Sequence, residues 1–402
     1  MTDTGVLSRQ ILELTRKHNR QQIDWRRHLH QYPELSDQEF ETTKFLAARA
    51  REIGLTVKTY DMPTGFVADL VGKTNKSKKT VAVRTDIDAL PILEQTNLPF
   101  TSKNEGCMHA CGHDVHMSTV LGTAAVLNDL RDQFDGTIRF LFQPSEEMPP
   151  GGAREFLKRG ALEGVSMIFG LHVDPHLATG KISVRDGETM GAVMDFDIVV
   201  HGVGGHAARP QNAVDAIVAA AAIIDALQKV VSREMDPIAP VAITCGKISG
   251  GTARNVIADR VELTVTARTL SADARKKLPK AIKRAVINTA KAHGAAADIE
   301  FVADYPVVIN DPAANRIIVG AAQKLLGKGK VALTEQVLGG EDFACYLEKI
   351  RGAMFRLGVR NTSIGADKSW HSPKFIVDED AISVGTAVMV QAAIDALRGT
   401  GR

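Results

Sequence analysis

The stretch VMDFDIVVHG, residues 193–202, predicts a strand and opens a region whose pattern differs from that of the preceding chain. The segments that follow it alternate in a defined order: a helix at 213–231, strands at 241–250 and 260–269, a helix at 272–292 and a strand at 296–304. The order β-α-β-β-α-β fits one ferredoxin-like unit of roughly a hundred residues. The sequence therefore predicts such a unit at 192–305.

Both flanks of this unit predict a different kind of domain. Before it, helical periodicity alternates with short β-rich runs, with helices at 37–53 and 110–131 and strands at 80–86, 136–142 and 165–173. After it, helices are predicted at 311–327, 341–350 and 379–398, with a strand at 353–359. The expected fold class is α/β, with a mixed sheet covered by helices and interrupted by the inserted ferredoxin-like unit. The first domain is then discontinuous, at 1–191 and 306–402.

Composition excludes several classes of protein. A chain of 402 residues suits two domains, and 44% hydrophobic with 24% charged residues is ordinary for a globular protein. The net charge is +2 without a long basic run, so no nucleic-acid partner is expected. Four cysteines are too few for a disulfide framework, and the first residues carry no secretory pattern. The longest apolar run, 216–224, is too short for a bilayer, so we expect a cytoplasmic protein without membrane contact.

The stretch HACGHDVH, residues 109–116, concentrates groups that bind metals. Cys111 and His113 flank one glycine, and a thiolate and an imidazole at this spacing can face one ion. A buried cysteine beside a capping histidine is the structural alternative. A thiol nucleophile is disfavoured because no local group provides its base.

A pair of carboxylates follows a predicted strand. Glu146 and Glu147, in QPSEEMPPGGA, lie near the carboxyl end of the strand, where open α/β sheets place their sites. Adjacent residues do not easily bind one ion together, but one can ligate while the other transfers protons. A solvated pair of glutamates is the alternative, and the prolines and glycines that follow make it less favoured.

Further candidates lie at strand ends or in a distant loop. His172 ends the apolar strand MIFGLHVD, and His371 lies in the loop SWHSPKF. Asp86 and Asp88, in RTDIDALP, end another strand, where either could orient a ligand histidine or serve as a turn residue. Together these segments offer one thiolate, three imidazoles and a carboxylate, with a second carboxylate to spare. Five ligands exceed one tetrahedral zinc site, so a pair of ions with a bridging group fits better.

The same segments resemble a known family. HACGHDVH, QPSEE, GLHVDP, GVGGHAARP, ARNVIAD, GGEDFA and WHSPKF occur in the order seen in hippurate hydrolases and indoleacetyl-amino-acid hydrolases, which are related to aminoacylases and carboxypeptidase G. The resemblance begins near residue 25, at WRRHLHQYPELS, and runs to the final helix. Two departures, MPPGGA after the glutamate pair and LGGEDF with glycine instead of serine, fall where they would reshape the acyl pocket.

The resemblance implies a role for each candidate residue. Two divalent ions (manganese, zinc, cobalt or nickel) would be held by Cys111, His113, Glu147, His172 and His371, with Cys111 as the bridge. Glu146 would be the general base, and His206 would polarise the scissile carbonyl, in one version from across a dimer interface. Asn255 and Arg268 would bind the free carboxylate of the substrate. The inserted domain would form a homodimer and close over the substrate.

The expected function is metal-dependent hydrolysis of the amide bond in an N-acyl-L-amino acid, hippurate-like or N-acetyl, releasing a carboxylic acid and a free amino acid. A dipeptidase or carboxypeptidase would share the metal centre and is the nearest alternative. A non-catalytic ligand-binding protein is disfavoured, because a pure binder needs no free carboxylate beside the metals. A redox-sensing thiol pair, Cys107 and Cys111, is the remaining alternative.

Overall fold

The computed structural model describes residues 3–73 and 76–399, and the chain forms two compact units. The larger unit contains the described residues up to Gly187, Ile309–Glu335, and those from Cys345 onward. The inserted unit contains Glu188–Val308 and Gln336–Ala344. The predicted boundaries place residues 336–344 in the first domain, but hydrogen bonds attach this segment to the inserted unit. The Gly191 N–H donates to the Gly339 carbonyl at 2.9 Å, and the Val337 N–H donates to the Thr189 carbonyl at 3.1 Å.

The larger unit is built on a mixed eight-stranded sheet, in the order β1-β2-β4-β3-β5-β16-β6-β15. Its strands are β1 (Thr56–Lys58), β2 (Phe66–Val71), β3 (Thr80–Asp86), β4 (Thr137–Gln143), β5 (Val165–Ala178), β6 (Ile182–Val184), β15 (Val331–Leu333) and β16 (Gly352–Arg360). The four central strands β4, β3, β5 and β16 run parallel, whereas β2 and β6 pair antiparallel with their inner neighbours. The predicted mixed sheet is confirmed.

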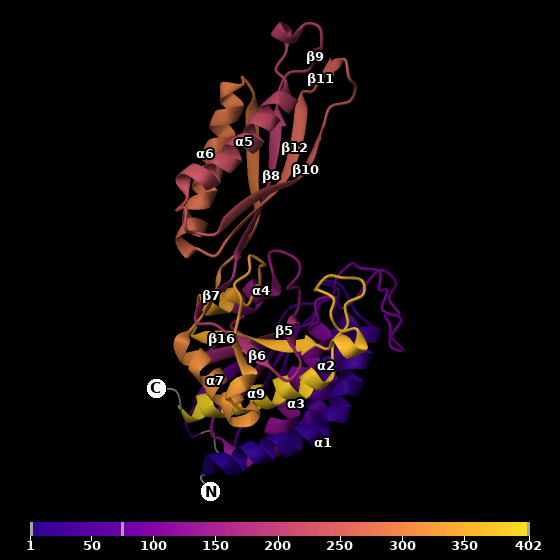
Figure 1. Cartoon of the computed structure of the whole chain (residues 1–402), viewed down its shortest axis with the longest axis vertical. Helices are drawn as coiled ribbons and strands as arrows, with labels where there is room; N and C mark the ends of the chain where they lie inside the picture. Colours follow the sequence, from indigo (N-terminus) through magenta and orange to yellow (C-terminus); the bar gives the residue numbers. More distant parts are fainter. Residues whose placement is uncertain (1–2, 74–75, 400–402) are drawn as a thin grey trace. The chain divides into compact units, whose positions relative to one another are not determined.

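Helices cover this sheet and bury its apolar strands. They are α1 (Asp3–Gln31), α2 (Phe40–Ile53), α3 (His113–Asp129), α4 (Gly152–Lys158), α7 (Pro312–Leu326), α8 (Ala344–Leu347) and α9 (Asp380–Arg398). α1, α3, α7 and α9 pack together on one face of the sheet (Figure 1). Within the described residues, α9 alone is long and apolar enough to cross a membrane, and 83% of its apolar window is buried inside the protein. It is accordingly a core helix.

The inserted unit is a four-stranded antiparallel sheet in the order β10-β12-β8-β13, with two long helices side by side (Figure 1). Its main elements are β8 (Ala192–His201), α5 (Ala216–Glu234), β10 (Val241–Gly250), β12 (Arg260–Thr269), α6 (Ala272–Ala292) and β13 (Ala296–Tyr305). Burial alternates along β12, so one face of the sheet packs on the helices and the other meets solvent. The predicted ferredoxin-like order is confirmed. Short strands β9 (Gly205–His206) and β11 (Val256–Ile257) pair together, as do β7 (Gly187–Met190) and β14 (Val308–Asn310).

One helix was not predicted, and two predicted helices differ from those in the structure. α1 was not predicted because it is rich in charged residues and buries only a narrow stripe that includes Leu7, Ile11 and Trp25. The helix predicted at 341–350 is a single turn, α8. The helix predicted at 110–131 begins only at His113, because the preceding residue adopts a left-handed backbone conformation.

Candidate active site

Parallel strands bring the candidate residues to one edge of the large sheet. Asp86 ends β3, Glu146 and Glu147 follow β4 after a two-residue turn, and His172 lies on β5. Because β3, β4 and β5 are parallel neighbours, their carboxyl ends meet at the same edge. A turn before α3 adds Cys111 and His113 to this edge, which therefore gathers residues from four separate segments.

A glycine makes the turn before α3 possible. Gly112 has a φ of 93°, a conformation that favours glycine, and a Cβ there would lie 2.5 Å from Val173 Cγ2. The backbone thus passes close to β5 and presents Cys111 and His113 on either side of the turn. Both side chains are buried, and the Cys111 Sγ lies 3.5 Å from the His172 Nε2.

Backbone carbonyls orient two of the predicted ligand histidines. The His113 Nδ1 lies 2.8 Å from the carbonyl oxygen of Asp88, and the His172 Nδ1 lies 2.8 Å from the carbonyl oxygen of Val173. In a neutral ring, a protonated Nδ1 donates in each of these bonds and leaves the Nε2 lone pair for the cluster. Burial lowers the pKa of His113, but the charges of Asp86 and Asp88 and that of Glu147 raise it to about 10, so a cation at Nε2 would replace a ring proton there. The Asp88 carboxylate adds a 3.3 Å contact to the His113 Nδ1.

Asp86 orients His116, a histidine outside the predicted set of site residues. Its carboxylate accepts a hydrogen bond from Arg84 at 2.8 Å and lies 2.8 Å from the His116 Nδ1. The His116 Nε2 in turn accepts the Val173 N–H at 2.9 Å. Because both ring nitrogens of His116 are engaged, we interpret this residue as a support for β5 and not as a metal ligand. Its position three residues after His113 on α3 was the available sequence signal.

The predicted ligands form two triads that share one atom. The Cys111 Sγ groups with His113 and His172, and it groups separately with Glu147 and His371. The Glu147 Oε1 lies 3.6 Å from the His371 Nε2 and 3.8 Å from the His113 Nε2. Ligand atoms around one zinc ion lie roughly 3.3 to 3.8 Å apart, given bonds of about 2.0 to 2.3 Å. These separations fit the ligand atoms of metal ions, and Cys111, which is common to both triads, would be the ligand that two ions could share.

His371 comes from a segment far along the chain. The backbone N–H of His371 donates to the Ala110 carbonyl at 2.9 Å, which fixes the loop against the turn that carries Cys111. The neighbouring Trp370 Nε1 donates to the Val173 carbonyl at 3.1 Å. His371 has a φ of 62° and its side chain is 53% exposed, unlike the other predicted ligands. It therefore lies at the solvent side of the cluster.

The chemistry of the cluster fits divalent transition metals. Among the buried atoms of the described residues, the His113 Nε2 and Glu147 Oε1 have no hydrogen-bond partner although they face the other ligands. Unpaired buried polar atoms are costly, and coordination to a cation would satisfy both. A donor set of thiolate, imidazole and carboxylate is one that transition metals accept. The residues present thus fit the pair of ions predicted from the sequence.

The electrostatics of the cluster lead to the same conclusion. Burial raises the pKa of the Cys111 thiol well above its usual value, and the charges of Glu147 and Glu146 raise it further. Burial lowers the pKa of His172 well below its usual value, with Arg356 adding to the effect, so this imidazole is neutral. A nearby cation would deprotonate the thiol and offset the charge of the carboxylates.

The turn that carries the ligands is anchored by a buried ion network. Asp114, next to His113, accepts from Arg26 Nε at 2.8 Å and lies 2.8 Å from the His30 Nδ1. The His30 Nε2 lies 3.1 Å from Glu94. All four side chains are at most 2% exposed. The motif WRRHLH on α1 therefore holds the first turn of α3 in place.

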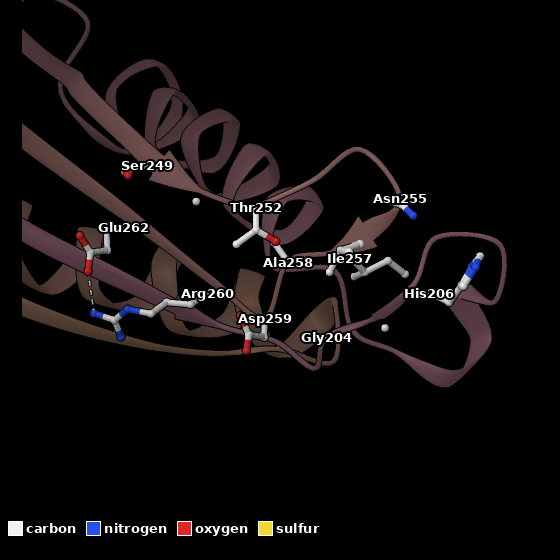
Figure 2. A pocket seen from close by; sticks show the side chains of 14 residues that line it. Gly204, His206, Ser249, Thr252, Asn255, Ile257, Ala258, Asp259, Arg260 and Glu262 are labelled. Atoms are coloured by element: carbon white, nitrogen blue, oxygen red, sulfur yellow. Dashed lines mark hydrogen bonds and ion pairs between the residues drawn. The ribbon is translucent and has the colours of Figure 1, made fainter.

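The three predicted residues of the inserted unit do not gather in one place. His206 on β9 and Asn255 beside β11 are exposed and line one hollow of about 740 Å³ (Figure 2). The His206 Nδ1 accepts the Ala208 N–H at 3.0 Å, which leaves the proton on Nε2. Arg268 lies near the opposite end of β12 from Arg260, which also lines this hollow. Arg268 lies eight positions after Arg260 along the strand, roughly 26 Å at about 3.3 Å per residue.

Comparison with known proteins identifies the family. Residues 82–395 match the model of peptidase family M20/M25/M40. The chain belongs to this family. The N-acetylcysteine deacetylase of Bacillus subtilis is 42% identical over 375 residues, covering 92% of this chain and 96% of the relative. Thermostable carboxypeptidase 1 of Saccharolobus solfataricus is 37% identical over 392 residues, covering 96% and 98%.

A solved structure agrees with this assignment. The Bacillus subtilis YXEP protein, described as a dinuclear metal-binding peptidase from the M20 family, superposes with a TM-score of 0.82 at 38% identity, covering 95% of this chain and 99% of that one. The predicted class of enzyme is confirmed: the chain is an M20 metallo-hydrolase with the metal-binding residue groups of a dinuclear family.

Proposed function

We propose that this M20 enzyme hydrolyses the amide bond of N-acyl-L-amino acids, N-acetyl or hippurate-like, and releases a carboxylic acid and a free amino acid. The observation that carries the proposal is the Glu146 carboxylate beside the ligand triads. It is 7% exposed and lies 4.0 Å from the His113 Nε2. Its neighbour Glu147 groups with Cys111 and His371, and it also groups with His113 and Glu146. Two relatives named for N-acetylcysteine deacetylation, 42% and 39% identical, support this choice of substrate.

The proposed ligands are Cys111, His113, Glu147, His172 and His371, for two ions of manganese, zinc, cobalt or nickel. Such ions supply polarisation of the acyl oxygen and bring the pKa of a water molecule toward neutrality. Glu146 accepts the proton of that water as it attacks the acyl carbon, and then donates it to the departing nitrogen. Asp88 and Asp86 keep the histidines His113 and His116 in a fixed tautomer during the reaction.

The inserted unit supplies the remaining proposed roles. His206 carries its proton on Nε2 and is exposed, so it can donate a hydrogen bond to the developing oxyanion. Asn255 and Arg268 bind the substrate carboxylate, which orients the amide. These two residues lie at opposite ends of the sheet in one chain, so a single carboxylate can meet both only if they come from different protomers. We therefore propose a homodimer in which one protomer lends His206 and Asn255 to its partner.

A complementation experiment tests this exchange. Glu146→Gln and His206→Ala proteins are each expected to lose most activity, and a refolded equimolar mixture is expected to regain about a quarter of the wild-type rate. Mixed dimers then contain one site with both an intact base and an intact His206, if all the dimers exchange randomly. Amino-acid release before and after mixing is the measurement. Activity that stays at the level of the separate variants would place His206 and Glu146 in the same chain.

The substrate class is tested by releasing amino acids from a panel. N-acetyl, N-benzoyl and N-indoleacetyl amino acids are compared with dipeptides and C-terminally blocked analogues, with manganese or zinc present. A kcat/KM at least tenfold higher for N-acyl amino acids supports the proposal. Two relatives named as thermostable carboxypeptidases, 37% and 38% identical, favour the second candidate, a carboxypeptidase. A preference for peptides would establish that candidate. A cytoplasmic location stays a prediction.

A further inference from the structure

A short loop between α1 and α2 binds the segment that carries Glu146 and Glu147. The loop contains Ser36, Asp37 and Glu39, within the stretch PELSDQEF. Ser36 and Glu39 are at most 5% exposed. Asp37 and Glu39 make hydrogen bonds to Ser145 in the turn after β4. Ser36 makes a hydrogen bond to Asp88, which accepts the N–H of Glu147 in the same turn. We call these three residues the clamp.

The first contact of the clamp is with Ser145, the residue directly before Glu146. Ser145 has a φ of 52°, in the left-handed region that residues other than glycine seldom adopt. Its N–H donates to the Glu39 carboxylate at 2.8 Å. Its hydroxyl accepts the Asp37 N–H at 2.8 Å and donates to the Asp37 carboxylate at 2.5 Å. The unfavourable conformation is thus held by hydrogen bonds from one loop.

The second contact holds the other side of Glu146. The Glu147 N–H donates to the Asp88 Oδ2 at 2.9 Å, and the Ser36 hydroxyl donates to the same oxygen at 2.7 Å. The backbone is therefore fixed one residue before Glu146 and one residue after it. The direction in which the Glu146 side chain leaves the backbone follows from these two points, because Cβ is set by the local φ and ψ.

A carboxyl group is a costly means of making this contact. Glu39 is 0% exposed, and burial together with the charge of Asp88 raises its pKa to about 7. A buried carboxyl beside another carboxylate does not favour folding. Its hydrogen-bond partners are its own backbone, the Thr64 side chain and the Ser145 N–H, and Ser145 is the residue with unfavourable backbone geometry next to the proposed base. We read this as stability given up at a functional site.

We propose that Glu39 is a positioning residue for the reaction: by accepting the Ser145 N–H, it keeps the backbone before Glu146 in the left-handed conformation that aims the Glu146 carboxylate at the attacking water. The proposal rests on the proposed function, in which Glu146 is the base. Glu39 acts through Ser145 and does not itself touch the substrate.

The test compares two substitutions of Glu39 with a matched control. Glu39→Gln keeps an oxygen that accepts the Ser145 N–H, so its kcat is expected within threefold of wild type. Glu39→Ala removes the acceptor, and kcat is expected to fall by about 10²-fold, the cost typical of a misplacement near 1 Å. KM and metal content are expected to stay within twofold. Glu34→Ala is the control, because Glu34 lies in the same loop and accepts the N–H groups of Glu41 and Thr42, in the first turn of α2, without touching Ser145.

A rescue separates positioning from a general loss of structure. Glycine adopts a φ of +52° at little cost, so adding Ser145→Gly to Glu39→Ala is expected to recover at least fivefold in kcat. This double variant also serves if Glu39→Ala alone does not fold. The proposal is overturned if the alanine and glutamine variants lose kcat equally, if Glu34→Ala loses as much as Glu39→Ala, or if the double variant recovers nothing. Glu146→Gln is assayed in parallel to test the proposed function separately. A fully active Glu146→Gln enzyme would show that Glu146 is not the base. An inactive Glu146→Gln enzyme together with a fully active Glu39→Ala enzyme would overturn only the positioning role of Glu39.

Discussion

Glu146→Gln is expected to lower kcat for N-acyl amino acid hydrolysis by about 10³-fold or more, within the range that general acid–base groups contribute. The amide has the size of the carboxylate, so the substrate and the metals have the same space. It cannot accept the proton of the attacking water or return it to the leaving nitrogen. Turnover is measured as amino-acid release, and metal content by elemental analysis after gel filtration. Two equivalents of metal are expected in the variant, as in the wild type.

Two further variants make the Glu146 result specific. Glu147→Gln removes a predicted ligand and is expected to lose metal as well as activity, since its Oε1 faces both His113 and His371. Glu300→Gln, on an exposed position of β13, is expected to match the wild type in both measurements. A Glu146→Gln enzyme with kcat within tenfold of wild type would show that the base is another group.

Cys111→Ala is expected to lose both metal ions, whereas His371→Ala is expected to lose only one. The reason is geometric: Cys111 belongs to both triads, and His371 belongs only to the one with Glu147. Replacement of residues that merely support metal ligands typically costs about 10- to 100-fold in affinity or activity, so loss of a ligand should lower turnover by more than about 10²-fold. Elemental analysis at a fixed free metal concentration gives the stoichiometry, and chelated wild-type enzyme gives the baseline.

The control for Cys111→Ala is Cys345→Ala, which removes another buried thiol of the larger unit. This control is expected to keep both ions and its activity. Chelation of the wild type is expected to abolish turnover, and added manganese or zinc is expected to restore it. Equal metal loss in Cys111→Ala and His371→Ala would contradict a shared thiolate and would require two separate ligand sets.

Sequence patterns predicted the architecture in those segments where buried, apolar residues recur at a regular spacing. The order of strands and helices from 193 to 304 was enough for the ferredoxin-like unit, because half-buried strands and amphipathic helices repeat with different periods. α1 was missed, since its many charges hide a narrow apolar stripe. The sequence also did not predict that residues 336–344 belong to the inserted unit. This segment is held there by backbone hydrogen bonds to residues distant in the sequence, and such bonds produce no periodic pattern of residues.

For the site, the sequence by itself determined which kinds of side chain are present and that they follow strand ends. It therefore predicted a metal centre from Cys111, His113, His172, His371 and one glutamate of the pair, with the other glutamate to spare. Only the tertiary structure decided how the neighbouring groups divide their work: His116 with Asp86 as support, Asp88 behind His113, and the loop of Glu39 behind Ser145. The physical reason is that a ring nitrogen or a backbone N–H is committed by hydrogen bonds of about 3 Å, and these depend on directions between segments that meet only after folding.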